Sequence, residues 1–576
     1  MPRKTRIISS MLIVIFTLIV LEIRLYYIQI VNHHRYRKMA DKQSFSVRQA
    51  DFKRGTIYDR NGNELAIEFE VSSVYAIPSL ISHRKETAKK LAPLLNMSEK
   101  AIRKKLHSSN SFVWLKRKID TEIAEKIDRL HLKGIKFINE GKRFYPENEL
   151  ASQVIGLAGL DNQGLSGIEN SFDPTLRRKT KKTVRRKDGF GREVIAADSA
   201  YQPEVSGCGV VTTIDRVIQY IAEVELKKAY NETKAKLATI IVQDSKTGEI
   251  LALANFPSFN GNSPSREKYK YLKNPAISSI FEPGSTFKPI VAAALLEENI
   301  VALEDRFYCE EGVYLFNGLP IRDHESEDWL TFIQVLEKSS NIGMAKAGQL
   351  LGKDKLYEYA RDFGFGNFTG IRLPGETPGI LKKPKDWSEI SLSRLSFGQG
   401  IGVTAIQLIS AFSSLANGGV LMEPMIVKRI VNPSGKAVKE FRPCPVRRVI
   451  SYKTAKTLTS ILCRIVEHGT GREARIMGYK VAGKTGTAQK FDAATGKYSD
   501  TNHIASFIGY LPAEQPKVTI LVILDEPQGF YWGGSVAAPV FARVGLRIMR
   551  HLGIPPDSQK MFRNPPQEAV SVGSPL

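Results

Sequence analysis

The chain has 576 residues, roughly three to four times the length of a typical single domain, so more than one globular unit is expected. Its hydrophobic content of 42% and charged content of 25% are those of a folded protein, which excludes a disordered or collagen-like chain. The net charge of +24 favours an anionic partner or surface. No zinc-finger spacing, aromatic ribonucleoprotein motif or heptad zipper accompanies this charge, so no nucleic-acid partner is expected.

The first predicted element is a membrane anchor over residues 7–31. Residues 7–21 contain no charged side chain, but fifteen helical residues span only about 22 Å of the roughly 30 Å bilayer core, so the span must continue past Glu22 and Arg24. A cleaved signal peptide is the alternative, yet the residues that follow are bulky where a small-x-small cleavage site is needed. Basic side chains within residues 1–6 predict a cytoplasmic tail, with the chain beyond the span outside the cytoplasm.

The next part, up to about residue 205, is polar and uneven. A helical pattern covers residues 86–106, and three segments are rich in turn-forming residues: RGTIYDRNG at 54–62, RFYP at 143–146 and GLSGIE at 164–169. The first of these predicts a hairpin, and taken alone all three are structural. A run of basic residues at 177–187 predicts a solvated loop or hairpin.

A second composition begins near residue 208. β-Branched runs at 210–214 and 238–243 predict strands, residues 240–252 predict strand, turn and strand, and two late strands are expected at 479–482 and 518–525. Strands at both ends of a region with helices between them predict an α+β domain with a largely antiparallel sheet over residues 208–552. The Pro- and Ser-rich residues 553–576 are expected to be a flexible tail.

Four widely spaced cysteines exclude a disulfide-stapled scaffold and a Cys-x-x-Cys metal or redox site: Cys208, Cys309, Cys444 and Cys463. They are predicted to be buried apolar residues, and a bridge stays possible if the domain is secreted.

The first chemical pattern is a serine three residues before a lysine, which places both side chains one turn apart on a helical face. The pattern occurs at least three times, and the copies at 82–85 and 265–268 lie in polar surroundings that predict surface positions. Ser285 and Lys288 instead follow a Pro-Gly turn at 283–284 and open an apolar helical run. This copy therefore predicts a serine nucleophile with a nearby amine.

Two further patterns follow along the chain. Residues Ser339, Ser340 and Asn341 have little specificity by themselves, because a helix cap explains them equally well. The sequence KTGT follows a strand that ends in small residues, against which an extended peptide could lie, although a hairpin turn also fits it; its residues are Lys484, Thr485, Gly486 and Thr487. In this order the three patterns form the set found in class A β-lactamases and penicillin-binding proteins, with Ser340 where that set has aspartate.

The sequence closely resembles the class B penicillin-binding proteins, the monofunctional peptidoglycan D,D-transpeptidases, and most closely their division-specific (septal) branch. The resemblance covers nearly the whole chain and is sharpest at FEPGSTFKP (281–289) and VAGKTGTAQK (481–490). The segments at 54–62 and 164–169 are similar to the family's N-terminal class B motifs. SFGQG at 396–400 and YWGGSVAAPVF at 531–541 point to the septal branch, although Gln399 stands where relatives often have an aromatic residue.

The resemblance implies an α+β transpeptidase domain at 208–552, carried on an elongated N-terminal pedestal of the dimerisation type at 45–205, with one transmembrane helix. No glycosyltransferase domain, cofactor or metal is implied. The expected partners are stem peptides ending in D-Ala-D-Ala, β-lactams, a SEDS-family glycosyltransferase and other division proteins. The expected location is the inner membrane, with the bulk of the chain periplasmic.

The implied chemistry is acyl transfer by Ser285, which would attack the carbonyl between the two terminal D-alanines. Lys288 would act as base once burial and the neighbouring Lys484 lower its pKa from about 10.4. Ser339 would pass a proton to the leaving amine, and Asn341 would hold Lys288 and the substrate amide.

The third motif and the backbone complete the implied site. Lys484, Thr485 and Thr487, with Gly486 between them, would receive the substrate carboxylate. Backbone N–H groups of Ser285 and Thr487 would form the oxyanion hole.

Three alternatives remain open at this point. A β-lactamase or β-lactam sensor shares the site, but the Glu-x-x-Leu-Asn element of class A β-lactamases is missing; the nearest match, at 389–393, lacks the asparagine. A D,D-carboxypeptidase would transfer the acyl group to water. A catalytically silent division scaffold would keep the fold without the chemistry.

Overall fold

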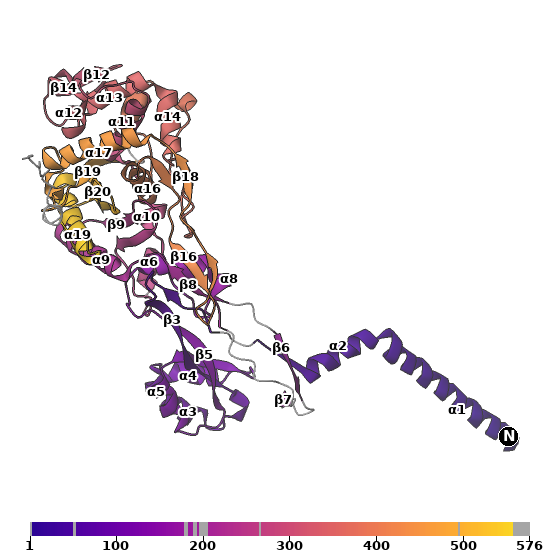
Figure 1. The fold of residues 1–576 in the computed structure, drawn as a ribbon. Helices are drawn as coiled ribbons and strands as arrows, with labels where there is room; N and C mark the ends of the chain where they lie inside the picture. The colour runs from indigo at the N-terminus through magenta and orange to yellow at the C-terminus, as the bar shows by residue number, and fades with distance from the viewer. Residues whose placement is uncertain are drawn as a thin grey trace, which may run out of the picture. The chain divides into compact units, whose positions relative to one another are not determined.

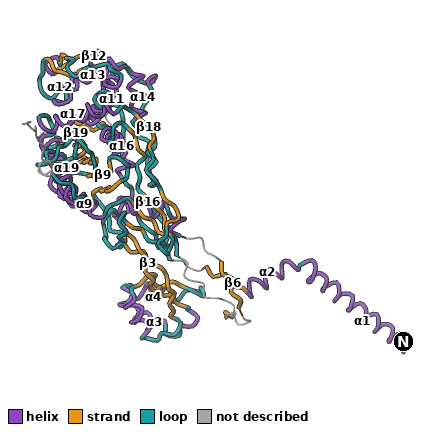
Figure 2. The backbone as a smooth tube through the Cα atoms, in the orientation of Figure 1, coloured by secondary structure: helices purple, strands orange, loops and turns teal. Residues whose placement is uncertain are grey.

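The computed structural model describes residues 3–49, 53–177, 182–187, 193–194, 206–263, 266–492 and 496–556 (Figures 1 and 2). It divides into two compact units, one of Met1–Lys53 with Arg178–Ser206 and the other of Arg54–Arg177 with Gly207–Leu576. Three sequence predictions fall wholly or partly outside the described residues: the tail from residue 557 on, Ser265, and residues 178–181 of the basic run at 177–187.

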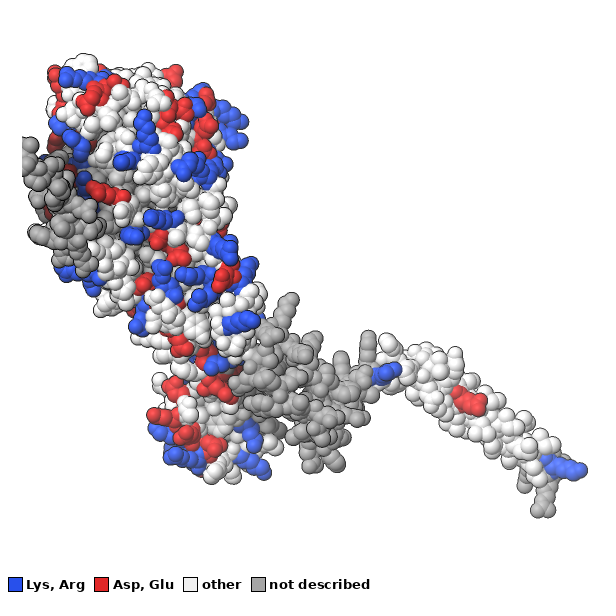
Figure 3. Space-filling model, viewed as in Figure 1, with Lys and Arg blue, Asp and Glu red and all other residues white. Residues whose placement is uncertain are grey.

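The smaller unit contains the predicted anchor. Helix α1 (Arg3–Tyr26) continues through a π-helical turn, η1 (Tyr27–Val31), and α2 (His33–Ser44) follows. Residues 7–31 are long and apolar enough to cross a membrane, as predicted, and their large apolar side chains are exposed. Figure 3 accordingly shows this helix almost free of charged atoms. A three-stranded sheet completes the unit, in the order β1 (Phe45–Gln49), β6 (Lys182–Lys187) and β7 (Glu193–Val194).

The larger unit begins with a β-sheet backed by short helices. Its long strand β3 (Glu64–Ala76) pairs with β4 (Val113–Ile119) and β5 (Ile135–Phe144), while α3 (Arg84–Leu95), α4 (Glu99–Leu106) and α5 (Thr121–Asp128) pack around them. The helical pattern predicted at 86–106 is confirmed, and two helices occupy it. Asn96 adopts the left-handed conformation (φ 49°) that ends α3, and the Ser98 side chain caps α4.

One sheet contains strands from both predicted domains. The strands run in the order β17 (Ala437–Glu440), β16 (Val427–Val431), β8 (Gly209–Thr212), β2 (Ile57–Tyr58), β3 and β4. The predicted hairpin at 54–62 is confirmed by the antiparallel pairing of β2 with β3. The expected boundary near residues 205–208 therefore lies next to strand β8 of a sheet that both parts share.

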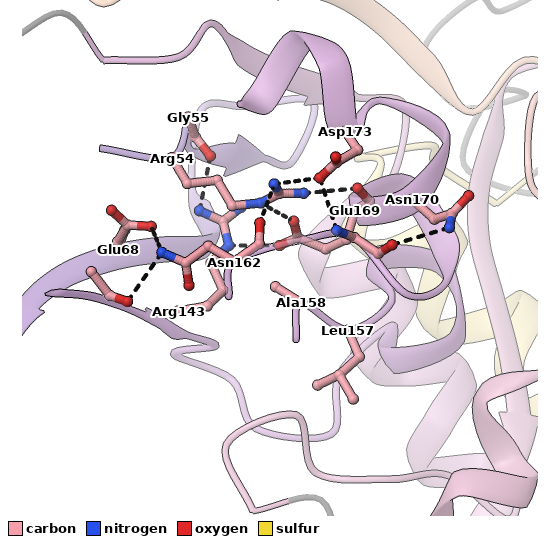
Figure 4. Close-up of polar contacts among 12 residues, drawn as sticks. Arg54, Gly55, Glu68, Arg143, Leu157, Ala158, Asn162, Glu169, Asn170 and Asp173 are labelled. Atoms are coloured by element: carbon pink, nitrogen blue, oxygen red, sulfur yellow. Dashed lines mark hydrogen bonds and ion pairs between the residues drawn. The ribbon is translucent and has the colours of Figure 1, made fainter. Parts of the chain in front are cut away.

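The three turn-rich segments of the N-terminal part meet in a buried ionic network (Figure 4). The Glu169 carboxylate accepts from Arg54 Nε and from Arg143 Nε, each at 2.6 Å, and all three side chains are almost fully buried. Arg54 also pairs with Asp173 at 2.6 Å. These residues lie at the start of the unit, in β5, in α7 (Gly167–Ser171) and in α8 (Asp173–Leu176), so the network ties distant segments together.

The centre of the larger unit is the antiparallel sheet that the sequence predicted. Its order is β10 (Ile250–Phe256), β9 (Leu237–Asp244), β21 (Val518–Asp525), β20 (Lys497–Leu511) and β19 (Ala482–Asp492). Alternate residues face two cores: Ile520 and Val522 pack with α9 (Arg216–Thr233) and α19 (Ala538–His551), whereas Leu521 packs with α16 (Ala405–Ala416).

The strand predicted at 479–482 begins only at Ala482, because a tight turn with Gly478 (φ 82°) pairs Ile476 with Tyr479. Two of the four cysteines are buried as predicted, Cys309 and Cys463, but Cys444 is exposed and Cys208 is half-buried; none forms a disulfide.

The region between β10 and β19 is mainly helical. Elements around the nucleophile motif are η3 (Arg266–Leu272), α10 (Pro275–Ser278), η4 (Gly284–Phe287) and α11 (Lys288–Glu297). Elements around the second motif are β11 (Arg306–Tyr308), η5 (Glu310–Gly312), β12 (Val313–Phe316), β13 (Leu319–Arg322), β14 (Trp329–Thr331), α12 (Phe332–Glu337) and α13 (Asn341–Leu351).

The remaining elements are short or peripheral. They are η2 (Pro78–Leu80), α6 (Ser152–Ile155), α14 (Lys353–Asp362), η6 (Pro384–Asp386), α15 (Ser391–Leu395), β15 (Val420–Met422), β18 (Pro445–Arg448), α17 (Tyr452–Glu467), η7 (Arg472–Ala474) and α18 (Gly533–Val536). On the face shown in Figure 3, basic and acidic side chains are interspersed over this unit.

Candidate active site

Ser285 lies in the 3-10 turn η4, immediately before the buried helix α11. Gly284 before it has φ +54°, a left-handed conformation that favours glycine, and its N–H donates to the Gly398 carbonyl at 3.1 Å. Pro289 falls in the first turn of α11, where its missing N–H costs no helical hydrogen bond. The sequence Pro-Gly before the serine and proline after the lysine thus sets where the turn ends and the helix begins.

Lys288 is the first residue of α11 and is completely buried. Its Nζ donates to the Ser339 carbonyl at 2.6 Å and to Asn341 Oδ1 at 2.8 Å. The one-turn spacing predicted a direct approach of Lys288 to Ser285, but no hydrogen bond between these two side chains is found in the described part of the chain.

The Ser339 hydroxyl instead connects the two residues. Ser339 Oγ donates to Ser285 Oγ at 3.0 Å, and it accepts from Lys288 Nζ at 3.1 Å and from Lys484 Nζ at 3.0 Å. A single hydroxyl therefore joins the predicted nucleophile to both predicted lysines, and the three sequence motifs meet at one point.

The second motif forms the turn between α12 and α13. Ser340 is the N-cap of α13 and its Oγ accepts from the Gly343 N–H at 2.9 Å, so the helix-cap interpretation of this motif is also correct. Ser339 has φ +60°, a conformation that is costly for a residue with a side chain and that is typically retained at functional sites.

The third motif lies on β19, the edge strand of the central sheet. Lys484 is completely buried, and Thr485 Oγ1 is within 2.8 Å of Thr470 Oγ1. Thr487 Oγ1 accepts from the Gly533 N–H at 3.0 Å. The two threonine hydroxyls predicted to bind substrate are thus both held by neighbours.

Gly486 allows β19 to lie directly against η4, the turn that contains Ser285. A Cβ atom at this position would come within 2.8 Å of Thr286 Cγ2 and 2.5 Å of Ser506 Oγ. At the same contact between β19 and η4, a Cβ atom at Gly284 would be 3.7 Å from the Thr487 carbonyl oxygen. The backbones of Ser285 and Thr487, predicted to form the oxyanion hole, therefore belong to two elements in direct contact.

Burial disfavours the charged form of both lysines, so each gives up its proton more readily than an exposed lysine does. It lowers the pKa of Lys288 to about 7, an effect that the negative charge of Asp323 partly opposes. Burial also lowers the pKa of Lys484 well below its ordinary value, and the nearby charge of Lys288 lowers it further. A neutral amine, able to accept a proton, is thus available at neutral pH.

Sequence reasoning missed three groups of this site. Asp323 accepts hydrogen bonds from the second motif, Thr470 holds Thr485, and Gly533 holds Thr487. Gly533 lies within the segment at 531–541 that resembles the septal branch, whereas Asp323 and Thr470 belong to none of the motifs recognised in the sequence. Within the described residues, no group of three His, Cys, Asp or Glu side chains is placed to hold a metal ion.

A serine hydroxyl linked through a second hydroxyl to two buried lysines, beside an edge strand, is an arrangement suited to a serine acyltransferase. Comparisons with known proteins give the family. Residues 238–545 match the penicillin binding protein transpeptidase domain, and residues 50–212 match the penicillin-binding protein dimerisation domain.

Similar proteins span almost the whole chain. Stage V sporulation protein D of Bacillus subtilis is 36% identical over 564 residues, covering 96% of this chain and 86% of that protein. The peptidoglycan D,D-transpeptidase FtsI of Escherichia coli is 32% identical over 544 residues, covering 93% and 90%. The crystal structure of penicillin binding protein 3 from Mycobacterium tuberculosis complexed with ampicillin superposes with a TM-score of 0.70 at 28% identity, covering 89% and 97%. The chain belongs to the penicillin-binding protein family, in the class B architecture of dimerisation and transpeptidase domains.

Proposed function

We propose that this chain is a peptidoglycan D,D-transpeptidase that cross-links stem peptides during septal cell-wall synthesis, and that β-lactams acylate the same serine. The observation that carries the proposal is the hydrogen-bonded path from Ser285 through Ser339 to Lys288 and Lys484. Relatives named peptidoglycan D,D-transpeptidase, FtsI of Escherichia coli and PenA of Neisseria gonorrhoeae, support the reaction. Their likeness to this chain over most of its length supports the septal role.

In the first half of the reaction, Ser285 Oγ forms a bond to the carbonyl carbon between the two terminal D-alanines. Its proton passes to Ser339, whose hydroxyl proton in turn is taken by neutral Lys288. The C–N bond then breaks, and the proton returns through the same path to the leaving D-alanine. The backbone N–H groups of Ser285 and Thr487 stabilise the oxyanion, the kind of interaction that contributes about 3–4 kcal/mol to a transition state.

In the second half, an amine of a neighbouring stem peptide attacks the acyl-enzyme. A new C–N bond forms, the bond to Ser285 Oγ breaks, and the proton of the amine returns to that oxygen through Ser339. The glutamate at position 389, nearest in sequence to the water-activating element of β-lactamases, is exposed and accepts from Asn317 Nδ2 at 2.8 Å. This engagement supports slow hydrolysis and long-lived acylation by penicillin.

The terminal carboxylate of the substrate is assigned to three residues of the edge strand β19, on either side of Gly486: Lys484, Thr485 and Thr487. A carboxylate placed beside Lys484 would favour the charged form of its amine, against the burial that lowers its pKa in the free site. Asn341 is assigned to hold Lys288 and the substrate amide, in keeping with its bond to Lys288 Nζ.

The anchor at residues 7–31 is assigned to the inner membrane, with the N-terminus cytoplasmic and the catalytic domain outside. A SEDS-family glycosyltransferase and other division proteins are proposed partners. This assignment rests on the class B domain architecture, which contains a transpeptidase domain and a dimerisation domain.

The test is covalent labelling of the full chain with a fluorescent penicillin, followed by mapping of the modified peptide. Ser285 is expected to carry the label, and Ser285→Ala to abolish it. Ser82→Ala is the matched control, because Ser82 and Lys85 share the serine–lysine spacing on an exposed segment. A label on another residue, or rapid loss of the label by hydrolysis, would overturn the transpeptidase assignment. Product analysis with and without an amine acceptor separates transfer to an amine from transfer to water.

A further inference from the structure

A short hairpin delivers a carboxylate to the second motif. Strands β12 and β13 pair around a tight turn at Asn317 and Gly318, both with positive φ, and Asp323 follows directly after β13. The Asp323 N–H donates to the Gly312 carbonyl at 3.0 Å, which holds this residue against the start of the same hairpin.

The Asp323 carboxylate binds the first residues of α13 with both oxygens. Oδ1 accepts from the N–H groups of Asn341 and Ile342 at 2.5 and 3.0 Å, and Oδ2 accepts from Ser340 Oγ at 2.5 Å. The first N–H groups of a helix have no partner within the helix, so a carboxylate here satisfies two of them and is favoured by the helix dipole.

Arg322, the residue before Asp323, also holds Asn341 in place. The Asn341 Nδ2 donates to the Arg322 carbonyl at 2.9 Å, while the Asn341 Oδ1 accepts from Lys288 Nζ at 2.8 Å. The end of β13 therefore fixes both the backbone and the side chain of Asn341, and with them the orientation of the oxygen that faces Lys288.

The strained turn at Ser339 needs such support. A residue at φ +60° persists only where its surroundings determine it, and Ser340 next to it is held by Asp323 through its side chain and by the Val335 carbonyl through its N–H. Releasing the Asp323 bonds would let the turn relax and move Ser339 Oγ away from Ser285.

The same carboxylate acts on the charge of Lys288. The groups facing Lys288 are Lys484 from β19, the uncharged Ser339 and Asn341 from the α12–α13 turn, and Asp323 beyond them. Burial lowers the pKa of Lys288 and the negative charge of Asp323 raises it, so loss of that charge would lower the pKa further.

We propose that Asp323 is a positioning residue for the acyl transfer, which supplies from a neighbouring hairpin the carboxylate that the related Ser-Asp-Asn motif carries at its middle position, here occupied by Ser340. It fixes Ser339 and Asn341 against Lys288 without touching the substrate. The inference rests on the proposed function, because it concerns the same reaction.

The test compares three variants of the full chain by the second-order rate constant of acylation with a fluorescent penicillin, measured across pH. Asp323→Asn removes the charge and one acceptor oxygen, and it should slow acylation by between about tenfold and about a hundredfold, with the pH midpoint moved to lower pH. Glu325→Gln removes an exposed carboxylate from the same segment and should acylate as the unaltered chain does.

An exchange variant, Asp323→Ser with Ser340→Asp, moves the carboxylate to the middle of the motif, where aspartate is also a good helix N-cap. It should recover most of the lost rate, and it decides the matter if Asp323→Asn alone does not fold. A purely structural role would lower the unfolding temperature of Asp323→Asn but leave its rate per folded molecule and its pH midpoint unchanged, and that result would overturn the inference.

An exchange variant that folds but stays slow would overturn the inference as well. An unaltered chain that penicillin does not acylate would instead overturn the proposed function, and this inference with it.

Discussion

At the scale of single residues, Ser339 has the most demanding position in the site. Its backbone adopts a left-handed conformation, its carbonyl accepts from Lys288, and its hydroxyl contacts Ser285 and both lysines. The cost of that conformation is met by the turn around it, where Ser340 caps α13 and Asp323 binds Ser340. In the proposed reaction, the hydroxyl would therefore pass a proton in either direction with little movement of heavy atoms.

The lowered pKa of Lys288 gives the first prediction at this scale. Because only the neutral amine accepts a proton, the rate of acylation by penicillin should rise with pH through about 7 and level off above it. Below that pH, Lys288 is protonated and the rate should fall about tenfold for each further unit. The measurement is the second-order rate constant from about pH 5 to about pH 9, with thermal unfolding over the same range as the control for folding. A rate that stays constant across this range, or that rises only near the ordinary lysine pKa, would contradict the assignment.

The predictability of these residues from sequence follows from how local their signals are. Ser285 and Lys288 are three residues apart with a Pro-Gly turn before them, so the geometry of one helical turn predicts that they lie together. The contacts of Asp323 with the second motif and of Thr470 with Thr485 depend on tertiary folding, and no spacing rule predicts them. The resemblance implied that Ser339 passes a proton, but its joint contact with Ser285 and both lysines could not be predicted from spacing, since it depends on three elements meeting.

At the scale of elements, local sequence signals again predicted part of the structure and missed what depends on turns. The strand at 518–525 was predicted at its observed bounds because a short run rich in β-branched residues has no competing helical period. The helical pattern at 86–106 was predicted correctly, but its division into α3 and α4 was not, because the apolar period continues through Asn96 while the backbone there takes a left-handed conformation. The start of β19 was misplaced for a similar reason, since Tyr479 is apolar but belongs to a turn.

The contact between β19 and the nucleophile turn gives a prediction at this scale. In Gly486→Ala, the new Cβ would lie 2.5 Å from Ser506 Oγ and 2.8 Å from Thr286 Cγ2, so the edge strand must shift away from η4. Overpacking of this kind costs about 1–3 kcal/mol, and the displaced Thr487 backbone should slow acylation by about tenfold or more. Stopped-flow acylation and thermal unfolding measure the two effects separately.

The control for this prediction is Ser506→Ala, which removes the nearest of the two obstructing atoms. Alone it should leave acylation almost unchanged, and combined with Gly486→Ala it should restore part of the rate. If Gly486→Ala acylates at the unaltered rate, the approach of the two elements does not limit the reaction.

At the scale of the whole molecule, the sheet that contains β8 and the ionic network around Glu169 both join regions that the composition of the sequence assigned to separate parts. Strand β8 pairs with β2 and with β16, so residues far apart in the chain share one hydrogen-bonded sheet. The network of Figure 4 lies among the same segments, with Glu169 completely buried between Arg54 and Arg143. The three turn-rich segments were recognisable in the sequence as structural, but their meeting at one carboxylate was not, because ion pairs over such separations leave no periodic signal.

Glu169 is therefore a position where a single change should weaken the larger unit strongly without touching Ser285, Lys288 or Lys484. In Glu169→Gln, Arg54 keeps Asp173 as a partner, but Arg143 loses the carboxylate to which its Nε donates and retains only the nearby charge of Glu68. Breaking a buried pair in this way costs about 3–5 kcal/mol, whereas the exposed pair of Glu125 with Arg129 contributes less than about 1 kcal/mol.

Unfolding of the full chain by denaturant, followed by tryptophan fluorescence, should accordingly show a large loss of stability for Glu169→Gln and almost none for the control Glu125→Gln. Penicillin acylation per folded molecule should stay close to the unaltered value in both, because the network holds the scaffold and makes no contact with Ser285, Lys288 or Lys484. An equal unfolding midpoint for the two variants would mean that the rest of the shared sheet holds these segments together without the ion pairs.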